Sequence, residues 1–174
     1  RVITGKLRIK PSQVDLSDVV EIAVEAARPA ADAKRIRIEL DLDRDHSVLR
    51  GDAERLQQVV WNLVSNAVKF TPKSGTVTVR LRRVESDLEL SVADTGEGIE
   101  PSFLPHVFEI FQQSDRGFSR PHGGLGVGLS IVKRLCDLLD AHLELQTAHG
   151  SGTTFRIFFP CEYGVVIQAG ETHP

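Results

Sequence analysis

NLVSNAVKF, residues 62–70, divides its side chains into two chemically different groups. In an α-helix from about Ala53 to Phe70, successive residues are turned by 100°, so the apolar side chains would gather in one sector. The polar side chains would form a separate stripe roughly 80° wide, comprising Arg55, Gln58, Asn62, Asn66 and Lys69. Asp52 can cap the start of this helix, and the Thr71-Pro72 turn would end it. The stretch therefore predicts an amphipathic helix with a defined polar face.

The chain of 174 residues suits a single domain with its own core. It has 41% hydrophobic and 26% charged residues and a net charge of -3, which predicts no broad basic surface for nucleic acid or an anionic membrane. No run approaches the roughly 18 apolar residues of a membrane span, and RVITGKLRIK has no signal-peptide core. We expect a cytoplasmic domain without membrane contact, whose parent protein could be anchored in the inner membrane. Cys136 and Cys161 lack metal-ligand spacing, and Cys136, inside a predicted helix, is expected to be a buried structural thiol. A structural disulfide is the less favoured alternative.

The remaining sequence predicts a mixture of helices and strands. A helix capped by Asp15 or Ser17 should run to about Lys34, with Pro29 interrupting or kinking it. Alternating apolar residues predict strands, of which two form a β-hairpin around residues 85–87. The predicted strands are RIRIELDLD (35–43), TVTVRLRRV (76–84), DLELSVAD (87–94), LELQT (143–147) and TTFRIFFP (153–160); 112–124 is a loop and 127–139 a helix. Because strict βαβ alternation is missing, this order favours a two-layer α/β sandwich.

The polar stripe of the helix over residues 53–70 admits two interpretations. It could be an ordinary solvated face. However, asparagine is a mediocre helix former, and the stripe has no carboxylate to pair with its cations. An amide oxygen can ligate Mg²⁺ and a lysine can reach a phosphate, so the alternative is a Mg²⁺-phosphate site.

The stretch LSVADTGEGI, residues 90–99, places Asp94 at the end of an apolar strand. Gly96 and Gly98 follow at alternate positions, where they permit positive φ and close approach of a ligand to the backbone. A carboxylate there can accept a hydrogen bond from an amino group such as the exocyclic amine of adenine. A tight turn capped by Asp94 is the structural alternative.

GGLGVGLSIVKRL, residues 123–135, opens a predicted helix with several glycines. The N-H groups at a helix N-terminus can bind phosphate oxygens that glycines allow to come close. The motif is neither a Walker loop nor a Rossmann fingerprint, because it lacks the Gly-Lys-Ser/Thr ending and a preceding strand. A flexible connector is the alternative.

Taken together and in order, these segments resemble the nucleotide-binding domain of sensor histidine kinases, within the gyrase, chaperone and MutL superfamily of ATPases (the Bergerat fold). NLVSNAVKFT is similar to the N box, DTGEGI to the G1 box, FEIF to the F box, GGLGVGL to the G2 box and GSGTTF to the last glycine box. The resemblance covers about residues 13–160. It implies a mixed, mostly antiparallel sheet covered on one face by about three helices.

The resemblance also implies roles for individual residues. Asn66 would ligate Mg²⁺, Lys69 and the lid residue Arg120 would reach the phosphates, and Asp94 would bind the adenine amine of ATP. Phe108 and Phe111 would pin the lid, unless they are ordinary core residues. The implied ATP-binding set is Asn62, Asn66, Lys69, Asp94, Gly96, Gly98, Ile99, Phe111, Gly124, Leu125, Gly126, Val127, Gly128, Leu129, Thr153 and Thr154, of which one threonine would complete the adenine end through its hydroxyl.

Asn62 bears most on mechanism. In the ATPase branches of the superfamily a glutamate one turn before the Mg²⁺ asparagine polarises the attacking water, whereas an amide cannot accept a proton. Hydrolysis is therefore disfavoured, and the γ-phosphoryl group would be kept for another acceptor. The rival functions are a gyrase- or chaperone-type ATPase and a nucleotide-sensing, partner-binding module without transfer activity.

The family's acceptor histidine lies on an upstream helical hairpin and usually precedes an acidic residue. None of the six histidines of this chain precedes Asp or Glu, so we expect the acceptor elsewhere in the full-length protein. Residues 1–12 resemble the end of that hairpin and its linker, and residues 161–174 are expected to be a tail or linker. The expected partners are the acceptor hairpin and a response regulator receiver domain; the isolated domain would be monomeric and the full-length kinase dimeric.

Overall fold

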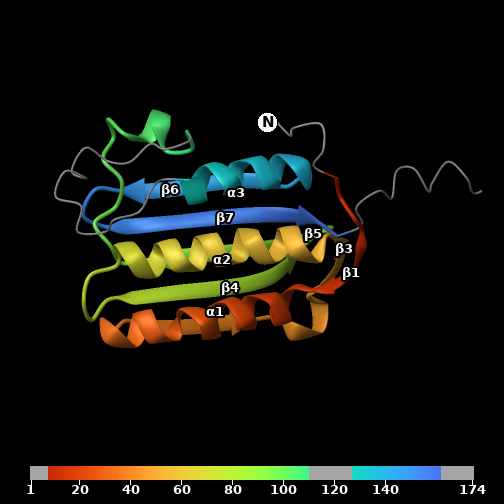
Figure 1. The fold of residues 1–174 in the computed structure, drawn as a ribbon, viewed down its shortest axis with the longest axis horizontal. Helices are drawn as coiled ribbons and strands as arrows, with labels where there is room; N and C mark the ends of the chain where they lie inside the picture. Colours follow the sequence, from red (N-terminus) through yellow and green to blue (C-terminus); the bar gives the residue numbers. More distant parts are fainter. Residues whose placement is uncertain (1–7, 110–126, 162–174) are drawn as a thin grey trace, which may run out of the picture.

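The computed structural model describes residues 8–109 and 127–161, which form a five-stranded sheet with three helices on one face (Figure 1). A separate two-stranded sheet lies at one end of the molecule. The elements are β1 (Ser12–Asp15), α1 (Leu16–Ala33), β2 (Arg37–Leu42), η2 (Arg44–His46), β3 (Val48–Gly51), α2 (Ala53–Phe70), β4 (Thr76–Val84), β5 (Asp87–Asp94), η3 (Leu104–His106), α3 (Val127–Leu138), β6 (His142–Ala148) and β7 (Gly152–Pro160). The predicted two-layer α/β sandwich is confirmed.

The large sheet has the order β2-β4-β5-β7-β6. Only β2 and β4 pair in parallel, and every other neighbouring pair in this sheet is antiparallel. Parallel neighbours need a crossover connection, which β3 and α2 supply between β2 and β4. The expected mixed, mostly antiparallel sheet is therefore confirmed.

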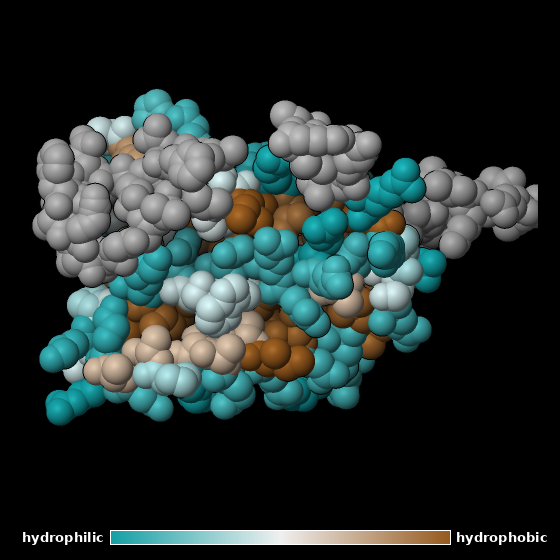
Figure 2. Space-filling view, in the orientation of Figure 1, coloured by the Kyte–Doolittle hydropathy of each residue, from teal (hydrophilic) through white to brown (hydrophobic). Residues whose placement is uncertain are grey.

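Helix α2 has the amphipathic character that its sequence predicts. It begins after Asp52, whose side chain accepts a hydrogen bond from the Arg55 N–H at 3.2 Å, and it ends at Phe70. Its buried residues are Leu56, Val59, Val60, Leu63, Val64, Ala67 and Val68. Figure 2 shows that hydrophilic residues dominate the exposed side of the helical layer, with hydrophobic surface visible between the helices. Burial of this apolar sector against the sheet, by the hydrophobic effect, fixes which way the polar stripe faces.

Helix α1 corrects one expectation. Asp15 is its cap, accepting a hydrogen bond from the Ser17 N–H at 3.0 Å, but the predicted interruption at Pro29 is wrong, since the helix continues to Ala33. Pro29 lies near the C-terminal end of the helix and has no N–H to donate to the Glu25 carbonyl. Both residues are exposed. Water can therefore satisfy the carbonyl that the missing N–H leaves without a helical partner.

The sequence analysis missed the small sheet in which β1 pairs with β3. Ser12 lies opposite Gly51 and Asp15 opposite Val48, so two segments more than thirty positions apart meet. Strands of four residues have too short a pattern to be distinguished from loops. The part of the chain that the structure describes contains no helix with the length and apolar character that crossing a bilayer requires.

Candidate nucleotide-binding site

The candidate site begins at the end of β5, where Asp94 lies opposite Thr153 at the start of β7. Asp94 Oδ1 accepts hydrogen bonds from the N–H groups of Gly96 at 2.8 Å and Thr153 at 3.3 Å. Burial raises the pKa of Asp94, while these two hydrogen bonds oppose that rise. Among the described residues Oδ2 has no partner. The carboxylate is therefore held in place by one oxygen, and the other can accept a hydrogen bond from a ligand.

Glycines let the loop after Asp94 pass between two backbone segments. A Cβ on Gly96 would lie 2.6 Å from the Phe70 carbonyl oxygen at the end of α2. A Cβ on Gly98, whose φ is +78°, would lie 2.2 Å from the Ala148 carbonyl oxygen. Both distances are shorter than real Cβ contacts, so only glycine fits without backbone movement. The loop thereby joins the end of α2 to the turn between β6 and β7.

Thr147 of β6 is a structural part of this site that the sequence analysis missed. Its hydroxyl oxygen accepts a hydrogen bond from the Ile99 N–H at 3.0 Å and donates one to the Gly152 carbonyl at 3.1 Å. It also lies 2.9 Å from the hydroxyl of Thr153. The Thr153 hydroxyl is thus already hydrogen-bonded within the protein. Nothing in the alternating pattern of LELQT distinguishes Thr147 from an ordinary strand residue.

The polar stripe of α2 lies next to the start of α3. The Asn62 side-chain N–H group donates to the Gln58 carbonyl at 2.9 Å, and a Cβ on Gly128 would lie 3.2 Å from Asn62 Oδ1. The Asn62 amide is therefore anchored to its own helix through nitrogen, with its oxygen toward α3. The Asn66 amide is partly buried and has no hydrogen-bond partner among the described residues. Lys69 Nζ lies 5.9 Å from the centroid of the Phe70 ring.

The structure brings together some of the residues that the sequence singles out and separates others. Hydrogen bonds join Asp94 to Gly96 and Thr153, and Thr147 joins Thr153 to Ile99. Gly96 also lies against the Phe70 carbonyl at the end of α2, and Gly98 lies against the Ala148 carbonyl.

The other predicted site residues lie apart from this group or outside the described residues. Leu129 packs against the core, and Thr154 alternates onto the opposite face of the sheet from Thr153. Phe108 packs edge-to-face on Phe155, with ring centroids 6.4 Å apart. Phe111, Arg120, Gly124, Leu125 and Gly126 lie outside the described residues, as does the side chain of Val127, the first residue of α3.

The described residues include no group of three or more His, Cys, Asp or Glu side chains that could hold a metal ion by themselves. Mg²⁺ does not need such a group, because it commonly binds one or two protein oxygens, several waters and the phosphates of a nucleotide. Asn66 fits this mode through its partly buried amide, which has no other partner in residues 8–109 and 127–161.

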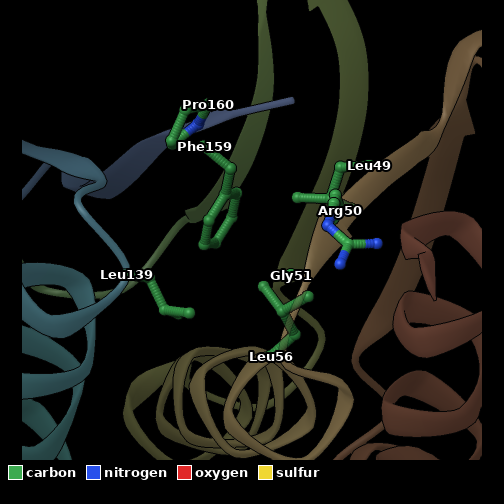
Figure 3. Close-up of a pocket in the computed structure, with 7 residues that line it drawn as sticks. All are labelled: Leu49, Arg50, Gly51, Leu56, Leu139, Phe159 and Pro160. Carbon is green, nitrogen blue, oxygen red and sulfur yellow. The ribbon is translucent and has the colours of Figure 1, made fainter. Parts of the chain in front are cut away.

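A small apolar cavity lies far from this site. Figure 3 shows it between the start of α2, the end of β7 and β3, with mostly aliphatic and aromatic side chains around it. Its lining residues are Leu49, Arg50, Gly51, Leu56, Leu139, Phe159 and Pro160. Phe159 and Asp94 lie toward opposite ends of the paired strands β5 and β7, so this cavity is unrelated to the Asp94 group.

Residues 51–163 match the family of histidine kinase-, DNA gyrase B-, and HSP90-like ATPases. This chain belongs to that family. The matched region contains Asp94, the loop after it, the stripe of α2 and the first turn of α3. The match to the family therefore includes the whole described part of the candidate site.

Within the family, the chain is similar to sensor histidine kinases. It is 35% identical over 162 residues to the circadian input-output histidine kinase CikA of Synechococcus elongatus. The matched region covers 92% of this chain and 22% of CikA. The structure of the mycobacterial sensor histidine kinase MprB has a TM-score of 0.75 and 29% identity, covering 88% of this chain and 99% of MprB. Full-length ShkA in complex with AMPPNP has a TM-score of 0.77 and 30% identity, covering 88% of this chain and 32% of ShkA.

The chain spans about a fifth of the length of the curated relatives that it matches. It therefore corresponds to one part of such multidomain sensor histidine kinases.

Proposed function

We propose that this domain binds ATP with Mg²⁺ and donates the γ-phosphoryl group to a histidine that lies outside this chain. The observation that carries the proposal is the arrangement around Asp94. Asp94 is a partly buried carboxylate, and one of its oxygens has no partner among the described residues. It precedes a glycine loop that contacts the C-terminal end of α2, where Asn66 and Lys69 are located. The carboxylate that we propose to bind adenine and the stripe that we propose to bind metal and phosphate thereby lie side by side.

In this proposal Asp94 Oδ2 accepts a hydrogen bond from the adenine amine. Asn66 is the protein ligand of Mg²⁺, which would neutralise charge on the phosphates. Lys69, the N–H groups at the start of α3 and Arg120 also interact with the phosphates. Phosphoryl transfer requires mainly positioning and charge neutralisation from the protein, and these groups supply both.

Asn62 would favour transfer over hydrolysis. Its amide nitrogen is bonded to the Gln58 carbonyl and its oxygen lies beside Gly128, so the side chain is anchored and neutral. A neutral amide cannot take a proton from an attacking water. The γ-phosphoryl group would therefore await a histidine presented by another domain.

The partners follow from this chemistry. We propose an acceptor-histidine hairpin in a dimeric parent kinase and a downstream response regulator, with the domain in the cytoplasm, where ATP is available. We also propose residues 13–160 as the domain, with linker segments on either side. Hydrogen bonds from the Lys10 N–H to Asp52 and from the Arg50 N–H to the Cys161 carbonyl tie the adjoining residues to it.

Equilibrium binding of ATP with Mg²⁺ to the 174-residue chain, measured by calorimetry, tests the first step. We expect saturable binding that Asp94→Ala abolishes and that Asp87→Ala, at the other end of the same strand, leaves unchanged. Addition of an acceptor hairpin from a sensor histidine kinase should then yield phosphohistidine. Absence of saturable binding would refute the proposal. Tight binding without transfer would favour a nucleotide-sensing module, and rapid steady-state hydrolysis would favour an ATPase.

A further inference from the structure

The last turn of α2 has its carbonyl groups bonded in an unusual way. A helix end leaves four carbonyls without helical partners, here those of residues 67–70. The Ala67 carbonyl accepts from the Thr71 N–H at 3.1 Å and from the Thr71 hydroxyl at 2.6 Å. The carbonyls of Val68 and Lys69 both accept hydrogen bonds from Lys34 Nζ, each at 2.9 Å. A single ammonium group from another helix therefore serves two of the four carbonyls.

Lys34 can reach these carbonyls because α1 and α2 end at the same end of the molecule (Figure 1). It is the residue that follows α1, and its backbone N–H bonds back to the Ala31 carbonyl at 3.1 Å. Its own carbonyl accepts from the Ser74 N–H at 2.9 Å, in the turn directly after α2. Lys34 therefore holds both the end of α2 and the turn that follows.

The ammonium group is held without a carboxylate partner among the described residues. Burial lowers the pKa of Lys34, as expected for a partly enclosed amine, and the two carbonyls supply its hydrogen bonds. A cation at a helix C-terminus also offsets the negative end of the helix dipole. The interaction combines directional hydrogen bonds with a favourable charge, which makes it suited to fixing the last turn of α2.

That turn is connected directly to the Asp94 loop. The Phe70 carbonyl lies against the backbone of Gly96, where a Cβ would come within 2.6 Å. Beyond the turn, the Thr76 N–H donates to the Thr95 hydroxyl at 3.0 Å, and the Thr95 N–H donates to the Thr76 carbonyl at 3.1 Å. The end of α2 and the segment after it, both held by Lys34, thus contact Gly96 and Thr95, the two residues that follow Asp94.

We propose that Lys34 is a positioning residue of the nucleotide site. It does not contact the nucleotide. It fixes the last turn of α2, and so sets Asn66 and Lys69 at the correct place relative to the adenine-binding carboxylate. This inference rests on the proposed function, since it assigns a role to Lys34 in binding the metal and phosphate part of ATP. Small displacements of positioned groups have large effects on binding and transfer.

Lys34→Met in the 174-residue chain tests this role, because methionine retains an unbranched stem and removes the ammonium group. Binding of ATP with Mg²⁺ should weaken by about tenfold, while binding of adenosine, which lacks phosphates, should change by less than about twofold. Amide hydrogen exchange in residues 68–71 of the nucleotide-free chain should become faster. Lys34→Arg, which keeps a cation, should restore most of the ATP affinity, and Lys73→Met, on the exposed turn nearby, should change none of these values.

The outcomes separate this inference from the proposed function. If the wild-type chain binds ATP and Lys34→Met binds it with the same affinity, the positioning role alone is overturned. An equal loss of ATP and adenosine binding would also overturn it, because that result indicates general loss of structure. Absence of ATP binding in the wild-type chain would overturn the proposed function first. If Lys34→Met does not fold, Lys34→Gln serves the same comparison, with the same selective loss required.

Discussion

Gly98→Ala should damage the candidate adenine site through a clash that can be stated atom by atom. Gly98 has φ +78°, and an alanine Cβ there would lie 2.2 Å from the Ala148 carbonyl oxygen and 2.8 Å from its carbon. Positive φ costs a non-glycine residue about 1–2 kcal/mol. Because both contacted atoms are backbone, the loop itself must move, which adds about 1–3 kcal/mol. We expect a total loss of about 2–5 kcal/mol of folding free energy.

Gly150→Ala is the matched control. Gly150 has φ +86°, but a Cβ added there would meet nothing within 4 Å. This substitution therefore carries only the conformational cost of about 1–2 kcal/mol. Both glycines lie where the Asp94 loop meets the turn between β6 and β7, since the Gly150 N–H bonds the Glu97 carbonyl. The difference between the two variants isolates the clash.

Thermal unfolding and ATP binding measure the two consequences. For a chain of this size, 1 kcal/mol corresponds to about 2–4 °C in Tm. Gly150→Ala should lower Tm by about 2–8 °C with ATP affinity nearly unchanged. Gly98→Ala should lower Tm further and also weaken ATP binding, because the displaced loop carries the Gly96 N–H, which donates one of the two hydrogen bonds to Asp94. Equal Tm values for the two variants, or full ATP affinity in Gly98→Ala, would refute the reasoning.

Three further substitutions or reactions give separate tests. Asp94→Asn should weaken ATP binding by about 10–100-fold, because it replaces the charged acceptor. It should also raise the Tm of the nucleotide-free chain at pH 7. Because folding raises the pKa of Asp94, the stability of the wild-type chain falls as the pH rises from the unfolded value of 3.8 through the higher folded value. The increase in Tm caused by Asp94→Asn, measured by calorimetry, should therefore shrink at lower pH. Asn62→Glu should increase steady-state ATP hydrolysis at least about tenfold by supplying a proton acceptor; bound ATP with no increase in phosphate release would contradict this. Burial raises the pKa of the Cys136 thiol to about 12, so a thiol reagent at pH 8 should label it only on unfolding, and rapid labelling of the native chain would be inconsistent with its burial.

Sequence periodicity predicted α2 accurately because the pattern is long and local. Eighteen residues contain several helical turns, and Asp52 and the turn after Phe70 mark both ends. The hairpin of β4 and β5 was predicted for the same reason, since its strands alternate and are adjacent in the chain. The four-residue strands β1 and β3 were missed because their pairing depends on residues far apart.

By itself, the sequence determined which residues could carry the chemistry: a carboxylate at a strand end, a glycine loop after it, and an amide and lysine stripe on a helix. Only the tertiary structure decided that Phe70 lies against Gly96, that Thr147 supports the loop and that Lys34 caps α2. It also placed Thr153 and Thr154 on opposite faces of the sheet. Local patterns specify secondary structure and the direction of an apolar face, whereas contacts between distant residues arise from packing and hydrogen bonding of the assembled layers.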